Sequence, residues 1–217
     1  MAAAPDPRAG RGRLIVFTFA PGISMPRIAL IIGSTRPNRF ADVPAAWVQA
    51  GAQARGLKLD TLDLRDHPLP LFEEPVPPSF TGGVYQNPAA DAWRKRIGEY
   101  DGYILTAAEY NHGPTAVLKN ALDSAFVEWA DKPVTFVGYG GVGGSRAIEQ
   151  LRQHAIELKM APIRNAVHIG LEPFLGILQQ GRALDDYAYL TQAREAMFDQ
   201  LLWWAEALKA ARERKVA

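Results

Sequence analysis

The sequence contains no cysteine, which excludes disulfides, thiolate nucleophiles, iron–sulfur clusters and cysteine zinc sites. The four histidines, at positions 67, 112, 154 and 168, are scattered without metal-ligand spacing, so we expect no metal site. An excess of charge of either sign is also lacking. The 24 basic and 23 acidic residues leave a net charge of +1, which gives no electrostatic case for nucleic acid or an anionic membrane. Redox chemistry would therefore need a bound organic cofactor.

Long hydrophobic runs are absent near the N-terminus. The apolar run at residues 14–20 is far too short to span a bilayer. It follows three arginines, as in a signal peptide, but Pro21 would directly follow the candidate cleavage site. We therefore expect residues 1–24 to be a disordered extension, or the product of a start codon assigned too early, and the protein to be cytoplasmic. With 48% apolar residues, residues 25–217 are long enough to form one domain with a sizeable core.

The first informative motif is a polar loop after a continuous aliphatic run at residues 27–32, which is typical of a central parallel strand. The loop reads Gly-Ser-Thr-Arg-Pro-Asn-Arg, and a helical pattern follows at about residues 41–54. This loop contains neither the Gly-x-Gly-x-x-Gly fingerprint nor the Walker Gly-Lys-Ser/Thr. Hydroxyls, backbone N–H groups, a helix N-terminus and two arginines predict a site for the terminal phosphate of a mononucleotide. The candidate residues are Ser34, Arg36 and Arg39, although both arginines could instead be ordinary surface residues.

A second polar loop follows an apolar run at residues 103–107, and Pro114 stands where the next helix is expected to begin. Loops of this kind lie at the carboxyl edge of an α/β sheet, where ligands bind. An acid, an aromatic, an amide and an imidazole suit a flat heterocycle with polar edges. These residues could also have purely structural roles: the tyrosine would pack in the core, the asparagine would stabilise the turn, and the histidine would hydrogen-bond to the backbone. The candidate residues are Ala108, Glu109, Tyr110, Asn111 and His112.

A third loop is rich in glycine and opens a helix expected at residues 144–159. Its glycines can bring N–H groups and the positive end of a helix dipole beside an anionic ring. They can equally exist for turn geometry alone. From this loop we select Gly140 and Gly141 as cofactor-binding candidates.

Together, the three motifs resemble those of the NAD(P)H-dependent FMN reductase family, flavodoxin-like enzymes that include quinone, azo-dye and chromate reductases. The likeness runs from about residue 25 to residue 169. Two departures occur: the family commonly has proline where Ala108 stands, and Ser-Ile-Pro-Gly at residues 113–116, where this chain has Gly-Pro-Thr-Ala. The matching segments are residues 33–36 for the flavin phosphate, residues 109–112 and 118–120 for the isoalloxazine, and residues 128–129, 132–133 and 138–147 beyond them.

The resemblance implies non-covalent FMN, with NADPH or NADH as hydride donor and a quinone-like or other small molecule as acceptor. It also implies a homodimer or a dimer of dimers. No side chain is assigned a catalytic role, because the redox chemistry belongs to the flavin. Two alternatives stay open: a flavodoxin-type electron carrier, and a non-catalytic interaction protein that kept the fold.

The remaining segments alternate between strand and helix, which predicts a parallel sheet covered on both faces. We expect a flavodoxin-like three-layer α/β/α fold with a five-stranded parallel sheet in the order 2-1-3-4-5. The proline-rich segment at residues 65–87 should be functional or mobile, and residues 170–181 stay unassigned. Further strands are expected at residues 57–64, 133–139 and 162–169, and further helices at residues 88–99, 114–129 and 184–209.

Overall fold

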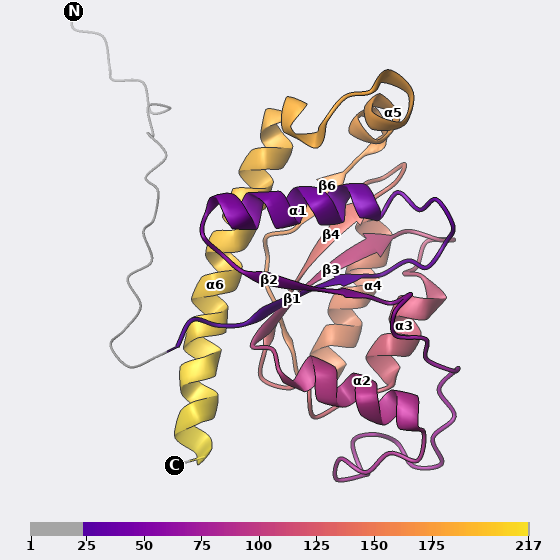
Figure 1. Ribbon diagram of the computed structural model, residues 1–217, viewed down its shortest axis with the longest axis vertical. Helices are drawn as coiled ribbons and strands as arrows, with labels where there is room; N and C mark the ends of the chain where they lie inside the picture. The colour runs from indigo at the N-terminus through magenta and orange to yellow at the C-terminus, as the bar shows by residue number, and fades with distance from the viewer. Residues whose placement is uncertain (1–23, 217) are drawn as a thin grey trace, which may run out of the picture.

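The computed structural model describes residues 24–216, so the expectation for residues 1–24 lies almost wholly outside the described residues. All strand pairs in this part of the chain are parallel, in the order β2-β1-β3-β4-β5, with β6 also beside β4 (Figure 1). This confirms the predicted strand order. The strands are β1 (Ile28–Ile32), β2 (Leu59–Asp63), β3 (Gly102–Ala108), β4 (Pro133–Tyr139), β5 (Ala161–Pro162) and β6 (Val167–Ile169).

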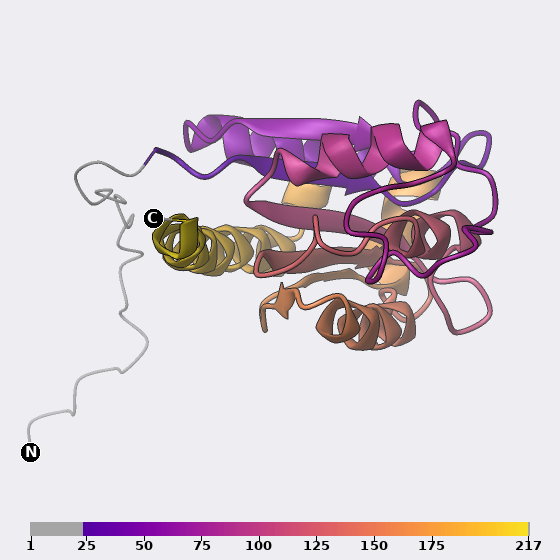
Figure 2. The same ribbon diagram turned by 90° about the horizontal axis from the view of Figure 1, so that it is seen from below.

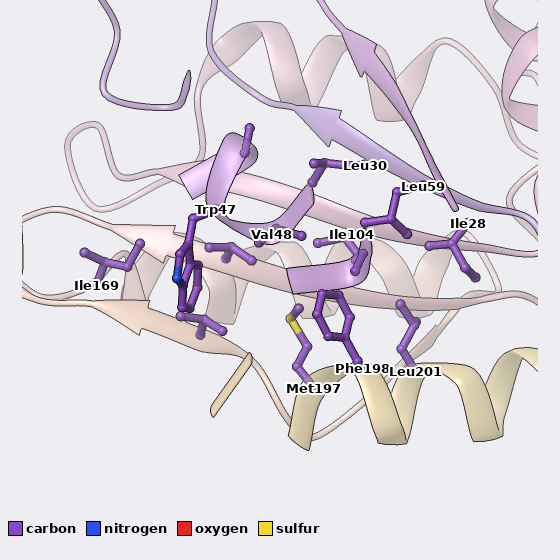
Figure 3. Close-up of a cluster of buried hydrophobic side chains, with 14 of the residues drawn as sticks. Ile28, Leu30, Trp47, Val48, Leu59, Ile104, Ile169, Met197, Phe198 and Leu201 are labelled. Atoms are coloured by element: carbon purple, nitrogen blue, oxygen red, sulfur yellow. The ribbon is translucent and has the colours of Figure 1, made fainter. Parts of the chain in front are cut away.

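Helices cover both faces of the sheet. On one face α1 (Asp42–Ala54) and α6 (Ala188–Val216) pack against the strands through Trp47, Val48, Phe198 and their neighbours (Figure 3). On the other face lie α2 (Pro88–Gly98), α3 (Ala116–Asp123) and α4 (Ser145–Glu157). Every residue of β1, β3 and β4 is buried, as expected of strands covered on both faces. The result is the predicted three-layer arrangement.

The loops after β1, β3 and β4 lie beside one another, because these strands are parallel neighbours. Ile32 pairs with Thr106, and Ala108 pairs with Tyr139, so the three strands end at one edge of the sheet. The chain leaves β1 toward β2 on one side and returns to β3 on the other. This reversal makes the β1–β3 border the topological switch point, where open α/β sheets bind ligands.

The fifth predicted strand, at residues 162–169, is in fact two short strands. Pro162 has no N–H for the sheet, and after one bond from the Ile163 amide to the Val134 carbonyl at 3.0 Å the backbone bonds side chains instead. The guanidinium of Arg152 donates to the carbonyl of Ile163 at 2.6 Å, and the Thr135 hydroxyl donates to the carbonyl of Asn165 at 2.7 Å. These bonds replace the missing ladder between β5 and β6.

One helix prediction was also inaccurate, and one further helix lies in a segment left unassigned. The helix expected from Pro114 begins at Ala116, because Thr115 is its N-cap and accepts a bond from the Leu118 amide at 3.2 Å. It ends at Asp123 instead of continuing to residue 129. The unassigned residues 170–181 contain α5 (Leu171–Gln180), which ends at Gly181 in the left-handed conformation.

The C-terminal helix also differs from its prediction. A short 3₁₀ turn at Leu184–Asp186 precedes it, and the helix continues to Val216. Its last turns are held beside the start of β1, where Lys209 donates to Ser24 at 2.8 Å and to Asp101 at 3.1 Å (Figure 2). These long-range bonds extend the helix beyond the predicted residue 209.

Candidate functional site

The loop after β1 begins at Gly33, which is fixed between β3 and α3. Its amide donates to the hydroxyl of Thr106 at 2.9 Å, and its carbonyl accepts from the hydroxyl of Thr115 at 2.5 Å. A Cβ atom at this position would lie 2.3 Å from the carbonyl oxygen of Thr106, a distance that real contacts do not show. Only glycine fits here, so the path of the anion loop is determined by the neighbouring strand.

The two arginines of this loop are placed differently. Arg39 is buried, and its guanidinium donates to Asp42 at 2.8 Å, to Asp63 at 2.7 Å and to the carbonyl of Ser34. Burial alone would raise the pKa of Asp63, but hydrogen bonds from Arg39 and the Arg65 amide outweigh it and lower that pKa. Because every nitrogen of the Arg39 guanidinium already bonds protein, Arg39 holds the loop in shape.

Arg36, by contrast, is exposed and pairs with no carboxylate among residues 24–216. Its guanidinium carbon lies over the ring of Tyr110, 5.8 Å from the centroid. The buried hydroxyl of Ser34 lies 3.4 Å from the hydroxyl of the same tyrosine. The structure therefore brings together the first two predicted motifs, which meet at Tyr110.

The second motif forms a tight turn. The amide of Tyr110 donates to the carbonyl of Gly113 at 2.9 Å, and the amide of Gly113 donates back to Tyr110 at 3.0 Å. Asn111 and His112 between them have positive φ angles of 51° and 70°. Two central residues with positive φ are the pattern of a type I′ turn, for which asparagine is favoured. The turn presents the side chains of both residues to solvent.

Two residues of α4, which we did not select from the sequence, hold this turn. The buried carboxylate of Glu109 accepts from the Arg146 amide at 3.1 Å and from its Nε at 2.5 Å. Nη1 of Arg146 lies 2.8 Å from Nε2 of His112, and Gln150 donates to the His112 carbonyl at 2.9 Å. Arg146 and Gln150 are four residues apart and share one helix face. The only available signal was the position of Arg146 inside the matching segment 138–147.

The glycine-rich loop is closely packed at Gly144 but has free space at Gly140 and Gly141. Gly144 has φ 66°, and a Cβ atom there would lie 2.9 Å from the carbonyl of Ala107. At Gly140 and Gly141, in contrast, a Cβ atom would meet no other atom within 4 Å. These two predicted residues therefore border free space, whereas the following glycines serve the close packing of α4 on the sheet.

These features fit a flat ring that carries a phosphate. Open backbone at Gly140 and Gly141, a polar turn and an exposed arginine without a carboxylate partner lie on adjacent loops. Burial raises the pKa of the nearby Tyr139 phenol, so this side chain is uncharged over a wide pH range. Within residues 24–216 no group of histidine and carboxylate side chains could hold a metal, and no helix is long and apolar enough to cross a membrane.

Comparisons with known proteins agree with this geometry. An NAD(P)H-dependent FMN reductase of a Nectria species is 33% identical over 193 residues, which cover 85% of this chain and 90% of that protein. An NADPH:quinone oxidoreductase of Arabidopsis thaliana is 34% identical over 140 residues, covering 62% and 68%. The flavoenzyme NAD(P)H:(acceptor) oxidoreductase of Paracoccus denitrificans has a similar fold, with a TM-score of 0.66, 19% identity and coverage of 84% and 98%. Residues 26–173 match the family model described as NADPH-dependent FMN reductase, so the chain belongs to that family.

Proposed function

We propose that the protein binds FMN non-covalently at the carboxyl edge of its sheet and uses NAD(P)H to reduce quinone-like or other small acceptors. The observation that carries the proposal is the meeting of the anion loop and the polar turn at Tyr110. Relatives point the same way, since those from Nectria and Arabidopsis are named as an FMN reductase and a quinone oxidoreductase.

Each side chain in the proposed site has a physical task. Arg36 and the loop N–H groups bind the phosphate, while Arg39 acts indirectly by holding the carbonyl of Ser34. Backbone N–H groups of Asn111, His112 and Gly141 are placed to stabilise negative charge on the bound ring, whereas those of Tyr110 and Gly140 already donate to the carbonyls of Gly113 and Ile169. When bound, FMN supplies the redox chemistry by taking two electrons from NAD(P)H and passing them to the acceptor. No side chain needs to act as a general acid or base.

The visible spectrum of the purified protein, recorded before and after addition of FMN, tests the binding. We expect a saturable flavin spectrum and steady NADPH oxidation in the presence of a quinone. If donor and acceptor use the same exposed face of the bound ring in turn, double-reciprocal plots should be parallel. Flavin binding with negligible turnover would favour the electron carrier. A colourless protein that does not take up FMN would favour the interaction protein.

The proline-rich segment at residues 65–87 supports a homodimer or a dimer of dimers. Leu71, Phe80 and Val84 are 78%, 80% and 74% exposed, which is unusual for three large apolar side chains on one loop. A second copy related by a two-fold axis could cover them, and with them one side of the flavin edge. Sedimentation at micromolar concentration should show a dimer or larger assembly. A fully active monomer would contradict this assignment.

We also place the enzyme in the cytoplasm, because NAD(P)H is a metabolite of the cell interior. Fractionation of the native host followed by immunodetection of the protein measures this directly. Recovery of the protein outside the cytoplasmic fraction would refute the assignment without affecting the proposed chemistry.

A further inference from the structure

Arg146 connects two residues of the polar turn that face in different directions. Its amide, Nε and Nη2 engage the carboxylate of Glu109, whose side chain is only 7% exposed. Its remaining terminal nitrogen, Nη1, lies 2.8 Å from Nε2 of His112. One guanidinium therefore joins a buried acid to an exposed imidazole at the tip of the turn.

The contact with Arg146 indicates which nitrogen of the His112 ring acts as a hydrogen-bond acceptor. A guanidinium carries only donors, so Nε2 of the imidazole must be the acceptor in this hydrogen bond. An imidazole that accepts at Nε2 is neutral and carries its proton on Nδ1. Among residues 24–216 no group bonds Nδ1 of His112, so this N–H is free to donate to a ligand.

We propose that Arg146 is a positioning residue that fixes His112 as a neutral Nδ1–H donor for a carbonyl oxygen bound at the carboxyl edge of the sheet. The oxygen belongs either to the ring of the flavin or to the reducible acceptor, since both present carbonyl groups of the same chemistry. This inference rests on the proposed function. It extends that function by giving a donor role to a side chain of this particular chain.

The backbone of the turn does not depend on Arg146 alone. The paired bonds between Tyr110 and Gly113, and the bond from Gln150 to the His112 carbonyl, hold its backbone independently. Substitution of Arg146 should therefore release the imidazole without unfolding the turn. For this reason the effect of the substitution on the ligand can be measured separately from its effect on the fold.

Nitrogen NMR of protein with labelled histidine tests the tautomer directly, with or without FMN. His112→Asn identifies the His112 signals among the four histidines. At neutral pH we expect a protonated Nδ1 and an unprotonated Nε2 at His112, and a mixture of tautomers in Arg146→Lys. A protonated Nε2 in the unmodified protein would overturn the inference, whatever the protein does with flavin.

His112→Asn and His112→Asp form a matched pair for the donor role. Both residues tolerate positive φ and have the same shape, but only asparagine can donate from the position of Nδ1. We expect asparagine to stay within about 3-fold of the unmodified protein, and aspartate to lose about 10-fold or more. Equal behaviour of the two variants would overturn the donor role.

The measurements also distinguish the two sources of the carbonyl. A weaker Kd for FMN, with a shifted midpoint potential, assigns the oxygen to the flavin. A raised KM for the quinone at unchanged FMN affinity assigns it to the acceptor. Arg146→Lys should show the same loss as His112→Asp. Arg152→Lys is the control, because Arg152 lies on the same helix and, among the described residues, hydrogen-bonds the carbonyls of residues 163 and 164 instead of the polar turn. If the FMN spectrum of the unmodified protein fails to appear, the proposed function fails, whereas the NMR result stands.

Discussion

An exposed arginine at the carboxyl edge of the sheet differs from the paired cations at its amino edge. At the amino edge, Asp101 accepts from Lys209 at 3.1 Å, from Arg212 at 2.6 Å and from the Arg27 amide at 2.9 Å. At the carboxyl edge, Arg36 is exposed and pairs with no carboxylate among the described residues. Lys209 and Arg212 thus have their anionic partner within the chain.

This difference separates stability from function. A charge that is paired inside the fold lowers the free energy of the folded state, but it offers little to a ligand. A charge left without a partner adds little to stability and is available for an anion. We therefore expect substitutions at the amino edge to change unfolding but not flavin binding, and those among exposed groups of the carboxyl edge to do the reverse.

The largest effect should come from the one position of the carboxyl edge where function and packing coincide. Gly33→Ala places a methyl group against the carbonyl of Thr106 and should lower the free energy of unfolding by about 3 kcal/mol. FMN affinity should fall with it, because the anion loop must move. Denaturant unfolding and FMN titration measure both. Gly170→Ala is the control, since a Cβ atom there meets nothing within 4 Å. Similar unfolding free energies of the two variants would show that the loop after β1 can move to accommodate the methyl group at little cost.

Asp101→Asn tests the amino edge. The side chain is 15% exposed and faces two cations, so loss of its charge should cost about 2 kcal/mol of unfolding free energy. The Kd for FMN should stay unchanged, because the site lies at the other edge. Asp91→Asn, which loses only surface pairs with Arg94 and Lys95, should cost less than about 1 kcal/mol. A change in FMN affinity in the Asp101 variant would contradict the expectation that the amino edge does not affect flavin binding.

Arg36→Ala is the converse test. Charged hydrogen bonds contribute about 1.5–3 kcal/mol each, so FMN should bind about 10- to 100-fold more weakly. Unfolding in the absence of flavin should change by less than about 0.5 kcal/mol, because the side chain is exposed. Riboflavin, which has no phosphate, should bind the variant and the unmodified protein alike. Equal losses for the two ligands would refute the phosphate role of Arg36.

The strand order and the site loops could be predicted because their signals are local. Runs of buried aliphatic residues gave β1, β3 and β4 nearly to the residue, and a polar loop after such a strand must lie at the carboxyl edge. The break in the fifth strand was missed even though Pro162 stood within it. The proline was visible in the sequence, but the replacement of its ladder by Arg152 and Thr135 was not.

The roles of the two loop arginines could not be distinguished from the sequence. Arg36 and Arg39 are three residues apart in the same motif, and only the partners differ. The acid that holds Arg39 is Asp63, 24 residues away, and Glu109 meets Arg146 across 37 residues. Neither pairing leaves a periodic or spacing signal, because it depends on which strands become neighbours. Side-chain networks of this kind follow from the fold and are known only once the strands are placed.

The smallest expected effect concerns Lys132, a cation of the amino edge that is buried and has no carboxylate in direct contact. Its ammonium group donates to the carbonyl of Gly98 at 3.1 Å and to the hydroxyl of Tyr103 at 3.2 Å. Burial lowers the pKa of Lys132 to about 8, and Arg212 adds to the effect, while the charges of Asp101 and Glu128 oppose it. Lys132 therefore differs from Lys209 and Arg212, which contact a carboxylate directly.

The sign of the pH dependence follows from this lowered pKa. Between about pH 8 and the ordinary value of 10.5, the unfolded chain holds a proton at Lys132 that the folded protein has lost. Raising the pH through this window therefore favours the folded state, by about 1 kcal/mol per pH unit at most. Denaturant unfolding between pH 8 and 9.5, below the range where the tyrosines of the unfolded chain ionise, should show stability that rises with pH. The rise should be absent in Lys132→Met and retained in Lys95→Met, whose lysine is exposed. A rise of equal slope in both variants would mean that a group other than Lys132 is responsible.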